Sequence, residues 1–301
     1  MKSKSILITG GAGFIGKHLL KRLLASNHRL TVVDNLSVNQ KNQLPKKVKF
    51  FKANIENPSI LKIFKKVKPE VVFHLAADNR VTNSPEETIK ANVIGTFNVL
   101  KTSQTAKVNQ VIFTSSAAVY GESKIFPIKE THPTKPISAY GISKLTGELY
   151  CQQFQKDFKT SIFRFANVYG PGQSSSSEGG VVSIFINKLL KNQKPIIYGN
   201  GKQTRDFIYV ADVVDALILS LNQPQNHTLN IGSNQPTTII DLLELTAKLT
   251  GKSGQFIKKP NRPVEIETSL FSRSLAQKTI GWKPKTSLES GLIETIKHFN
   301  Q

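Results

Sequence analysis

The sequence predicts an α/β fold, namely a doubly wound parallel sheet with a smaller C-terminal lobe. Short apolar, β-branched runs alternate with amphipathic stretches, an order that places helices between parallel strands. A glycine-rich turn joins the first apolar run to the first helical stretch. The chain has 301 residues, enough for one large domain and a smaller lobe.

The composition is that of a globular protein with one cysteine, Cys151, and a net charge of +21. A single thiol allows no intrachain disulfide and suits a reducing compartment. The sequence has no apolar run of membrane-spanning length and no signal peptide, so we expect a cytoplasmic protein without a membrane partner. The lysines are dispersed along the chain, so we expect a basic surface, and nucleic-acid binding is the less favoured interpretation.

The first predicted strand, residues 5–9, runs directly into a glycine turn and a helix. Gly11, Gly13 and Gly16 match G-x-G-x-x-G, and Gly10, Gly13 and Gly16 match the related G-x-x-G-x-x-G pattern. In a strand–turn–helix context this pattern is typical of dinucleotide binding, because the bare backbone can approach a pyrophosphate at the helix N-terminus.

The second predicted strand, residues 29–33, ends at Asp34. A carboxylate at this point accepts hydrogen bonds from the adenosine ribose and repels a 2′-phosphate. The sequence therefore predicts NAD and not NADP as the cofactor of a Rossmann domain.

The next elements follow the same alternation: a strand at 48–51, a helix at 60–67 and a strand at 70–74. We expect His74, at the end of that strand, to be structural, because a lone histidine there has no visible catalytic partner. The small residues of Leu75-Ala76-Ala77 leave room for a cofactor across the strand ends. Residues 85–105 predict one long helix with Ile89, Val93, Phe97 and Leu100 on one face.

A strand at 111–114 and a helix at 138–158 complete the candidate site. Ser116 lies just past the strand end, where ligands bind in such sheets. Tyr140 and Lys144 are four residues apart and share a helix face. A nearby ammonium is expected to lower the phenol pKa, which would make Tyr140 a general acid/base. The alternative is an ordinary helix with a solvated tyrosine and lysine.

These features together resemble the extended short-chain dehydrogenase/reductases that act on nucleotide sugars. The similarity rests on the glycine turn, Asp34, residues 74–77, Asn92, residues 115–116 and Tyr140-x-x-x-Lys144. It continues in the same order through residues 164–171, 198–207, 230–232, 262–263 and 281–284. It spans nearly the whole chain and is greatest to the UDP-glucose (UDP-galactose) 4-epimerases.

The resemblance implies that Tyr140 is the catalytic base, that Lys144 is its partner and binds the nicotinamide ribose, and that Ser116 bonds the sugar. The NAD-contacting set it implies is Gly10, Gly13, Phe14, Ile15, Gly16, Asp34, Asn35, Asn54, Ile55, Leu75, Ala76, Ala77, Asn92, Thr114, Tyr140 and Lys144. Asn54 departs from the aspartate that is usual in the family, and residues 78–80 depart from the usual loop.

The resemblance also implies a nucleotide-sugar site. Asn167, Arg205 and Arg262 would bind the diphosphate, Tyr198 would pack on the uracil, and Glu265 would lie near the ribose. The full substrate set is Ser116, Asn167, Val181, Val182, Ile196, Tyr198, Arg205, Arg262, Glu265 and Ser269. The alternative for Arg205 is a surface salt bridge with Asp206. Ser269 aligns with a position that gates the carbon 2 substituent, and a serine there leaves room for an N-acetyl group; alternatively, it is merely a strand-end residue.

The implied reaction is epimerisation at carbon 4 of a UDP-hexose through a 4-keto sugar. Nucleotide-sugar dehydratases and decarboxylases carry an acid just after the active-site serine or threonine, where this chain has Ala117 and Ala118. Other nucleotide-sugar reactions (UDP-glucuronate epimerisation, dehydration or reduction) stay open, as does a non-catalytic NAD- or nucleic-acid-binding protein on the same fold.

The resemblance and the strand–helix alternation together predict two domains. Residues 1–168, with a return segment at 203–232, would bind NAD, and residues 169–202 and 233–301 would bind the nucleotide sugar. The helices at 85–105 and 138–158 are expected to form a homodimer interface as a four-helix bundle.

Overall fold

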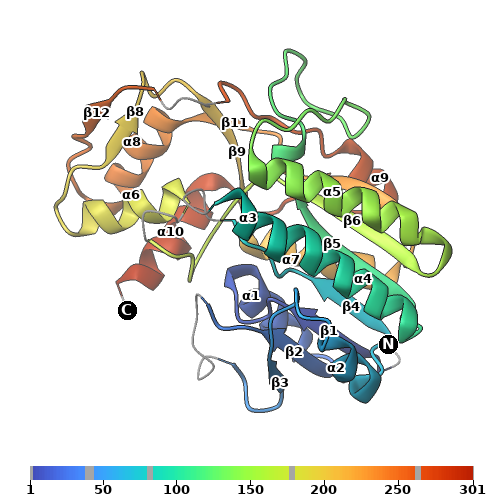
Figure 1. Ribbon diagram of the computed structural model, residues 1–301. Coiled ribbons are helices and arrows are strands. Elements are labelled where there is room, and N and C mark those ends of the chain that lie inside the picture. Colours follow the sequence, from blue (N-terminus) through green and yellow to red (C-terminus); the bar gives the residue numbers. More distant parts are fainter. Residues whose placement is uncertain (1–2, 38–43, 80–83, 176–179, 262–265, 301) are drawn as a thin grey trace. The chain divides into compact units, whose positions relative to one another are not determined.

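The computed structural model describes residues 3–37, 44–79, 84–175, 180–261 and 266–300, which fall into two compact units (Figure 1). Unit 1 comprises Met1–Val119, Ser138–Arg164 and Val214–Leu229. Unit 2 comprises Tyr120–Ile137, Phe165–Val213 and Asn230–Gln301. Unit 2 thus includes 120–137 and all of 203–213, which the sequence prediction assigned to the NAD-binding domain. No helix among the described residues is long and apolar enough to cross a membrane.

The central sheet confirms the predicted doubly wound architecture. Its seven strands run in the order β3-β2-β1-β4-β5-β6-β10, and β1 pairs in parallel with both β2 and β4. β2 and β3 follow on one side of β1, and β4, β5 and β6 follow on its other side. Such sheets bind ligands at this point, where the strand order reverses. The strands are β1 (Ser5–Thr9), β2 (Arg29–Asp34), β3 (Lys49–Lys52), β4 (Val71–His74), β5 (Gln110–Ser116), β6 (Lys159–Phe165) and β10 (His227–Ile231).

The strands of unit 1 are apolar because both sheet faces are covered by helices. Leu7 of β1 packs in a core cluster with Val72, Val111 and Phe113, and its neighbours Ile6 and Ile8 are equally buried. Successive strand residues point to opposite faces, so both faces must be covered. The covering helices are α1 (Phe14–Leu23), α2 (Ile60–Val67), α4 (Gly95–Thr105), α5 (Ala139–Gln153) and α7 (Val210–Asn222).

The predicted helix at 85–105 is helical throughout, but it is not a regular α-helix. It consists of α3 (Pro85–Thr88), a π-helical segment (Ile89–Ile94) and α4. The wider π turn shifts the side-chain periodicity. As a result Leu100 is buried, whereas Ile89 and Phe97 are 49% and 40% exposed, so the expected single apolar face is wrong.

Unit 2 has its own core, in which α6 (Val181–Leu190), α8 (Ile239–Thr250) and α10 (Leu288–Phe299) pack around Phe185, Ile197 and Leu242. Its three-stranded sheet has the order β11-β9-β7, and β12 pairs in parallel with β8. The remaining elements are β7 (Asn167–Tyr169), β8 (Ile196–Tyr198), β9 (Thr204–Tyr209), β11 (Pro236–Thr238), β12 (Ile257–Lys259) and α9 (Ser274–Ile280).

Candidate active site

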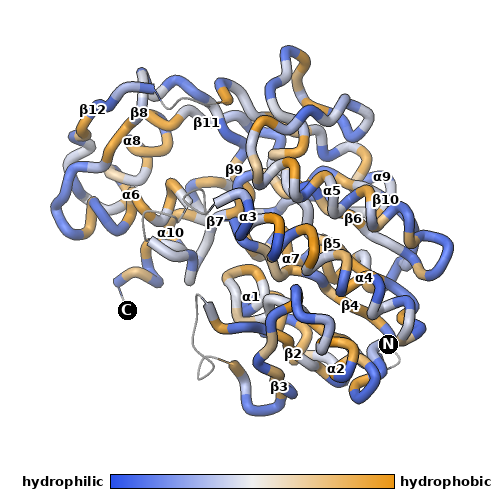
Figure 2. Tube along the Cα trace, viewed as in Figure 1, coloured by the Kyte–Doolittle hydropathy of each residue, from blue (hydrophilic) through white to orange (hydrophobic). Residues whose placement is uncertain are grey.

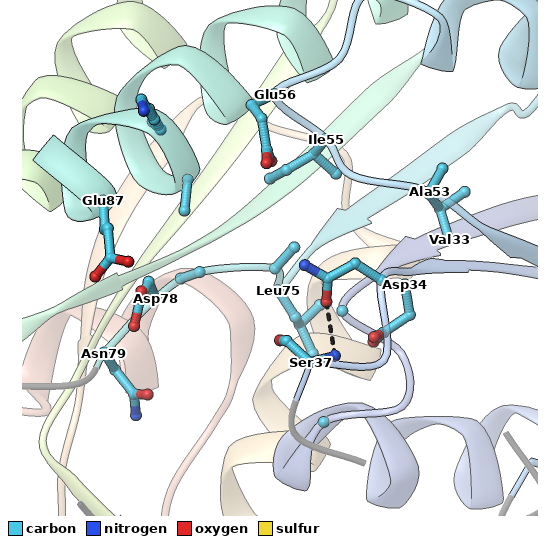
Figure 3. Close-up of a pocket in the computed structure, with 17 residues that line it drawn as sticks. Val33, Asp34, Ser37, Ala53, Ile55, Glu56, Leu75, Asp78, Asn79 and Glu87 are labelled. Carbon is cyan, nitrogen blue, oxygen red and sulfur yellow. Dashed lines mark hydrogen bonds between the residues drawn. The ribbon is translucent and has the colours of Figure 1, made fainter. Parts of the chain in front are cut away.

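A cavity of about 420 Å³ opens in unit 1 at the carboxyl ends of β1, β2, β3 and β4 (Figure 3). This is the sheet edge beside β1 where the strand order reverses. The lining residues are Gly10, Gly13, Val33, Asp34, Asn35, Ser37, Ala53, Ile55, Glu56, Leu75, Ala76, Ala77, Asp78, Asn79, Glu87, Lys90 and Ala91.

The glycine turn forms a backbone cradle at one side of this cavity. Gly10 has a φ of 70°, and a Cβ there would lie 2.6 Å from the Ala76 nitrogen, so only glycine fits. A Cβ on Gly16 would lie 2.5 Å from the Gly10 carbonyl oxygen, so this position packs against the turn. At Gly13 a Cβ would meet only the Gly10 oxygen, at 3.1 Å, which leaves its cavity side bare. The cradle therefore fits a dinucleotide pyrophosphate at the N-terminus of α1.

Asp34 stands across the cavity from the loop after β4, at the end of β2 (Figure 3). Its Oδ2 accepts a hydrogen bond from Ala12 N at 3.0 Å, and its Oδ1 accepts one from Leu36 N at 2.8 Å. Each carboxylate oxygen can accept a further bond. Asp34 thus orients the glycine turn while keeping acceptor capacity for ribose hydroxyls.

Eight of the expected NAD contacts line the cavity: Gly10, Gly13, Asp34, Asn35, Ile55, Leu75, Ala76 and Ala77. The others, Phe14, Ile15, Gly16, Asn54, Asn92, Thr114, Tyr140 and Lys144, lie outside its lining. Sequence reasoning missed Ser37, Glu56, Glu87 and Lys90, among others. Glu56 could have been found from its place just after β3, since strand-end loops line this edge, but Glu87 and Lys90 carry no such signal.

Asn92, in the π-helical segment, is buried and engaged by the protein itself. Its Nδ2 donates to the Asp78 carbonyl at 2.8 Å and to Ser143 Oγ at 3.0 Å, while its Oδ1 accepts from Asp78 N at 2.7 Å. The side chain therefore joins the loop after β4 to α5, which carries Tyr140 and Lys144.

Ser116, Tyr140 and Lys144 come together where β5 ends and α5 begins. Ser138 caps α5 by accepting from Gly141 N at 3.1 Å, which fixes the first turn and with it Tyr140. Ser116 bonds Tyr140, but burial outweighs this bond and raises the pKa of Tyr140 to about 12. The expected lowering of this pKa by Lys144 is therefore wrong, because desolvation disfavours the phenolate more than the neighbouring groups favour it.

Lys144 is buried, and its Nζ donates to the Thr114 carbonyl at 2.8 Å. The ammonium lies 5.1 Å from the centroid of the Phe113 ring and 5.8 Å from that of Tyr140. Burial lowers the pKa of Lys144 to about 8, so the amine is largely protonated at neutral pH.

His74 is a structural residue, as predicted. Its Nδ1 bonds Thr9 Oγ1 at 2.7 Å, and its Nε2 bonds Thr96 Oγ1 at 2.9 Å. Burial lowers the pKa of His74 to about 3, so the ring is neutral and both nitrogens are used.

Unit 2 carries the expected substrate residues of the lobe. Arg205 lies on β9, and its Nη1 donates to the carbonyls of Thr204 at 2.8 Å and Ile266 at 2.7 Å. Asp206 is fully buried and accepts from Ser233 N at 2.7 Å and from Asn234 N at 3.1 Å. Asp206 therefore holds the loop after β10 from a buried position, and the alternative of a surface salt bridge between Arg205 and Asp206 is wrong.

The other substrate candidates differ in exposure. Asn167 is exposed on β7, and Ile196 and Tyr198 are half-buried on β8. Val181 and Val182 begin α6, and the Val182 side chain is part of the core of unit 2. Ser269 is 9% exposed and donates its backbone N–H to Thr204 O. Arg262 and Glu265 lie outside the described residues.

Known proteins resemble this chain along its length. The model of the NAD dependent epimerase/dehydratase family matches residues 6–232. A UDP-glucose 4-epimerase of Mycolicibacterium smegmatis is 34% identical, with 97% of each chain covered. A UDP-glucose 4-epimerase from Thermotoga maritima, solved with UDP-glucose, superposes with a TM-score of 0.95 at 38% identity, with 98% of each chain covered. A UDP-N-acetylglucosamine 4-epimerase from Methanobrevibacter ruminantium, in complex with UDP-N-acetylmuramic acid, superposes at 0.94 with 32% identity, covering 100% of this chain and 99% of its own.

Proposed function

The chain belongs to the NAD dependent epimerase/dehydratase family, and from this premise we propose that it interconverts UDP-hexoses that differ in configuration at carbon 4. The observation that carries the proposal is the cluster of Ser116, Tyr140 and Lys144 in the same unit as the dinucleotide cavity. The similarity to UDP-sugar 4-epimerases over nearly the whole chain supports it. Ala117 and Ala118, which follow Ser116, lack the carboxylic acid that dehydration requires.

The chain's own residues supply the proton chemistry. When bound, NAD supplies the hydride acceptor and donor together with a positively charged ring. Tyr140 removes the proton from the carbon 4 hydroxyl and later returns it, while Ser116 bonds the sugar oxygen. The Ser116 bond favours the phenolate against its burial, and the Lys144 ammonium, 5.8 Å from the centroid of the Tyr140 ring, acts in the same direction.

The first test is incubation with UDP-glucose or UDP-galactose, followed by separation of the isomers. Tyr140→Phe removes the acid/base group and should lower kcat by about 10²- to 10⁴-fold, the usual contribution of such a group. Tyr150→Phe, on the same helix, is the control and should retain activity. Undiminished interconversion by Tyr140→Phe would refute the proposed role of Tyr140.

We propose that the substrate range includes UDP-N-acetylhexosamines, because Ser269 is small where a bulky side chain would fill the space beside carbon 2. The Methanobrevibacter ruminantium neighbour is named for such a substrate. The measurement that tests this proposal is the ratio of kcat/KM for UDP-N-acetylglucosamine to that for UDP-glucose. Ser269→Tyr should lower this ratio at least about tenfold by exclusion of volume. An unchanged ratio, or no wild-type activity on the N-acetyl sugar, would contradict this range.

Diphosphate binding is proposed for Asn167 and Arg205 in unit 2, together with Arg262. Their donors suit phosphate oxygens, and guanidinium groups do so bidentately. Arg205→Met should raise KM for the UDP-sugar more than it lowers kcat, because the diphosphate is held throughout the reaction.

We also propose a cytoplasmic location, for which the buried free thiol of Cys151 is suited.

A homodimer is proposed through the helices at 85–105 and 138–158. Hydrophobic residues recur along α4 and α5 (Figure 2). Several are exposed on the π-helical segment, α4 and α5: Ile89, Ile94, Phe97, Ile142 and Leu149. α4 and α5 pack on each other and would form a four-helix bundle with a second copy. Leu149→Glu should convert the dimer to monomer in sedimentation at micromolar concentration, whereas Ile125→Glu, at a more exposed site, should not. Monomeric wild-type protein would refute this proposal.

A further inference from the structure

Three successive residues of β5 are each held by one residue of α5, and these α5 residues are four apart. Lys144 Nζ donates to the Thr114 carbonyl, Ser115 Oγ donates to Glu148 Oε1, and Ser116 bonds Tyr140. Residues four apart lie on one helix face, so Tyr140, Lys144 and Glu148 form a single row. The proposed reaction uses two members of this row, and Glu148 is the third.

The Glu148 carboxylate is buried and is bound by neighbouring side chains. It is 0% exposed, and Arg164 of β6 binds it with two nitrogens, Nε to Oε1 at 2.9 Å and Nη2 to Oε2 at 2.6 Å. The Arg164 side chain is only 7% exposed. A buried ion pair gains little net stability, since desolvation offsets the attraction. The pair therefore calls for an explanation other than stability.

Helix α5 lies against β5 with almost no space between them. A Cβ on Gly147 would lie 2.7 Å from Phe113 Cζ, so a methyl group there would require the Phe113 ring or the helix to shift. At this separation the bond between Glu148 and Ser115 fixes the strand end directly. Because Ser116 is the next residue of β5, its position is fixed as well.

We infer that Glu148 is a positioning residue of the proposed epimerase reaction, which fixes the strand end that carries Ser116 and keeps the buried Lys144 charged. This inference rests on the proposed function for its effect on turnover. Glu148 is the only acidic residue of α5. It lies one turn from Lys144, on the side away from Tyr140.

The other groups around Lys144 do not replace this charge. Burial raises the pKa of the Cys151 thiol far above its usual range, and burial holds the pKa of His74 at about 3, so both are neutral near pH 7. Tyr140 is protonated at rest, and Arg164 is a cation. Burial lowers the pKa of Lys144 to about 8, and Glu148 acts against that lowering. Loss of Glu148 would therefore lower the pKa of Lys144 further.

The experiment compares pH profiles of kcat/KM and of NAD affinity. Glu148→Gln should move the alkaline limb of both profiles to lower pH by about one unit, as expected for loss of a neighbouring charge. This variant leaves Arg164 buried and unpaired and can fail to fold. The second variant, Glu148→Gln with Arg164→Met, removes both charges and should show a smaller shift in the same direction.

Ser115→Ala tests the positioning effect separately, with Ser161→Ala as the matched control. Ser161 is an equally buried strand serine that bonds Gln110 and Gln225, away from α5. Ser115→Ala should lower kcat about tenfold with little change in KM or in the alkaline limb, because small misplacements of reacting groups are costly. Ser161→Ala should leave kcat unchanged.

Two results would overturn the inference: alkaline limbs of the Glu148 variants that coincide with the wild type, or a Ser115→Ala variant indistinguishable from Ser161→Ala. NAD affinity needs no sugar substrate. If the wild type turned over no UDP-hexose, the proposed function would fail, while the pH dependence of NAD affinity would still decide the role of Glu148 toward Lys144.

Discussion

Asp34 illustrates how one side chain can serve both the fold and the ligand. Its oxygens accept from Ala12 N and Leu36 N, so the carboxylate holds the glycine turn and the start of the next loop. The same carboxylate lines the cavity, where it would meet the adenosine ribose. Its place at the cavity was predictable, because the residue ends a predicted strand whose carboxyl end faces the ligand edge of the sheet. Asn92 and Glu148 were not predictable as clamps, because their partners are distant in sequence.

Asp34→Asn keeps the shape of the side chain and removes its charge. We expect about tenfold weaker NAD affinity and a smaller preference for NAD over NADP, because the neutral amide no longer repels a 2′-phosphate. Fluorescence titration with both cofactors measures this. Glu87→Gln, at another carboxylate of the same cavity, should leave the NAD to NADP preference unchanged. A preference that stays the same in Asp34→Asn would contradict this role.

His74 predicts how stability depends on pH. Its folded pKa of about 3 lies below the value of about 6.5 in the unfolded chain, so the unfolded state binds the proton first. Stability is therefore full above pH 6.5 and falls as the pH drops toward 3. By pH 5 the loss should be about 2 kcal/mol from this residue, at about 1.4 kcal/mol per pKa unit. Urea unfolding between pH 7 and 5 measures it.

His74→Asn should flatten this slope, whereas His298→Asn should leave it unchanged, because His298 is exposed on α10. An identical slope in His74→Asn and wild type would show that another group controls the acid limb.

At the scale of elements, the strands were predictable and the π-helical segment was not. Buried parallel strands show as apolar runs, and β1 and α2 match the predicted bounds. A π turn holds one more residue than an α turn, but the pattern of polar and apolar residues does not mark it. Residues 85–105 were therefore predicted to form one α-helix. The segment is fixed by tertiary bonds of Asn92, which no local pattern reveals.

Asn92 predicts a measurable coupling between the π-helical segment and α5. Asn92→Ala should destabilise the fold by about 2 to 3 kcal/mol, because it removes both side-chain hydrogen bonds to the Asp78 backbone. In a double-mutant cycle with Ser143→Ala, the coupling energy should be about 1 kcal/mol in urea unfolding. Strict additivity would mean that the bond between Asn92 and Ser143 contributes nothing.

At the scale of the whole molecule, the order of motifs predicted the sheet, whereas its division into units was less accessible. The segment Tyr120–Ile137 belongs to unit 2 because Asn230 binds it, accepting from Tyr120 Oη at 2.7 Å and donating to the Ile128 carbonyl at 3.0 Å. These partners are about a hundred residues apart, and only the folded chain shows the link.

Because the net charge is +21, we expect the free energy of unfolding to depend on ionic strength, and this can be tested at one site. Lys62 is exposed in the first turn of α2, a helix with no acidic residue there and with Lys65 and Lys66 one turn further on. Lys62→Glu should raise the free energy of unfolding by about 1 kcal/mol at low salt. It relieves repulsion, suits the helix N-terminus and faces Lys66 four residues on.

The gain should shrink in about 0.5 M salt, which screens exposed charges. Lys297→Glu is the matched control, because Lys297 already pairs with Glu294 at 2.8 Å in the last turn of α10. There the same change should destabilise the protein at low salt. If both substitutions stabilise the protein at low salt, the excess of positive charge and not local structure governs the response.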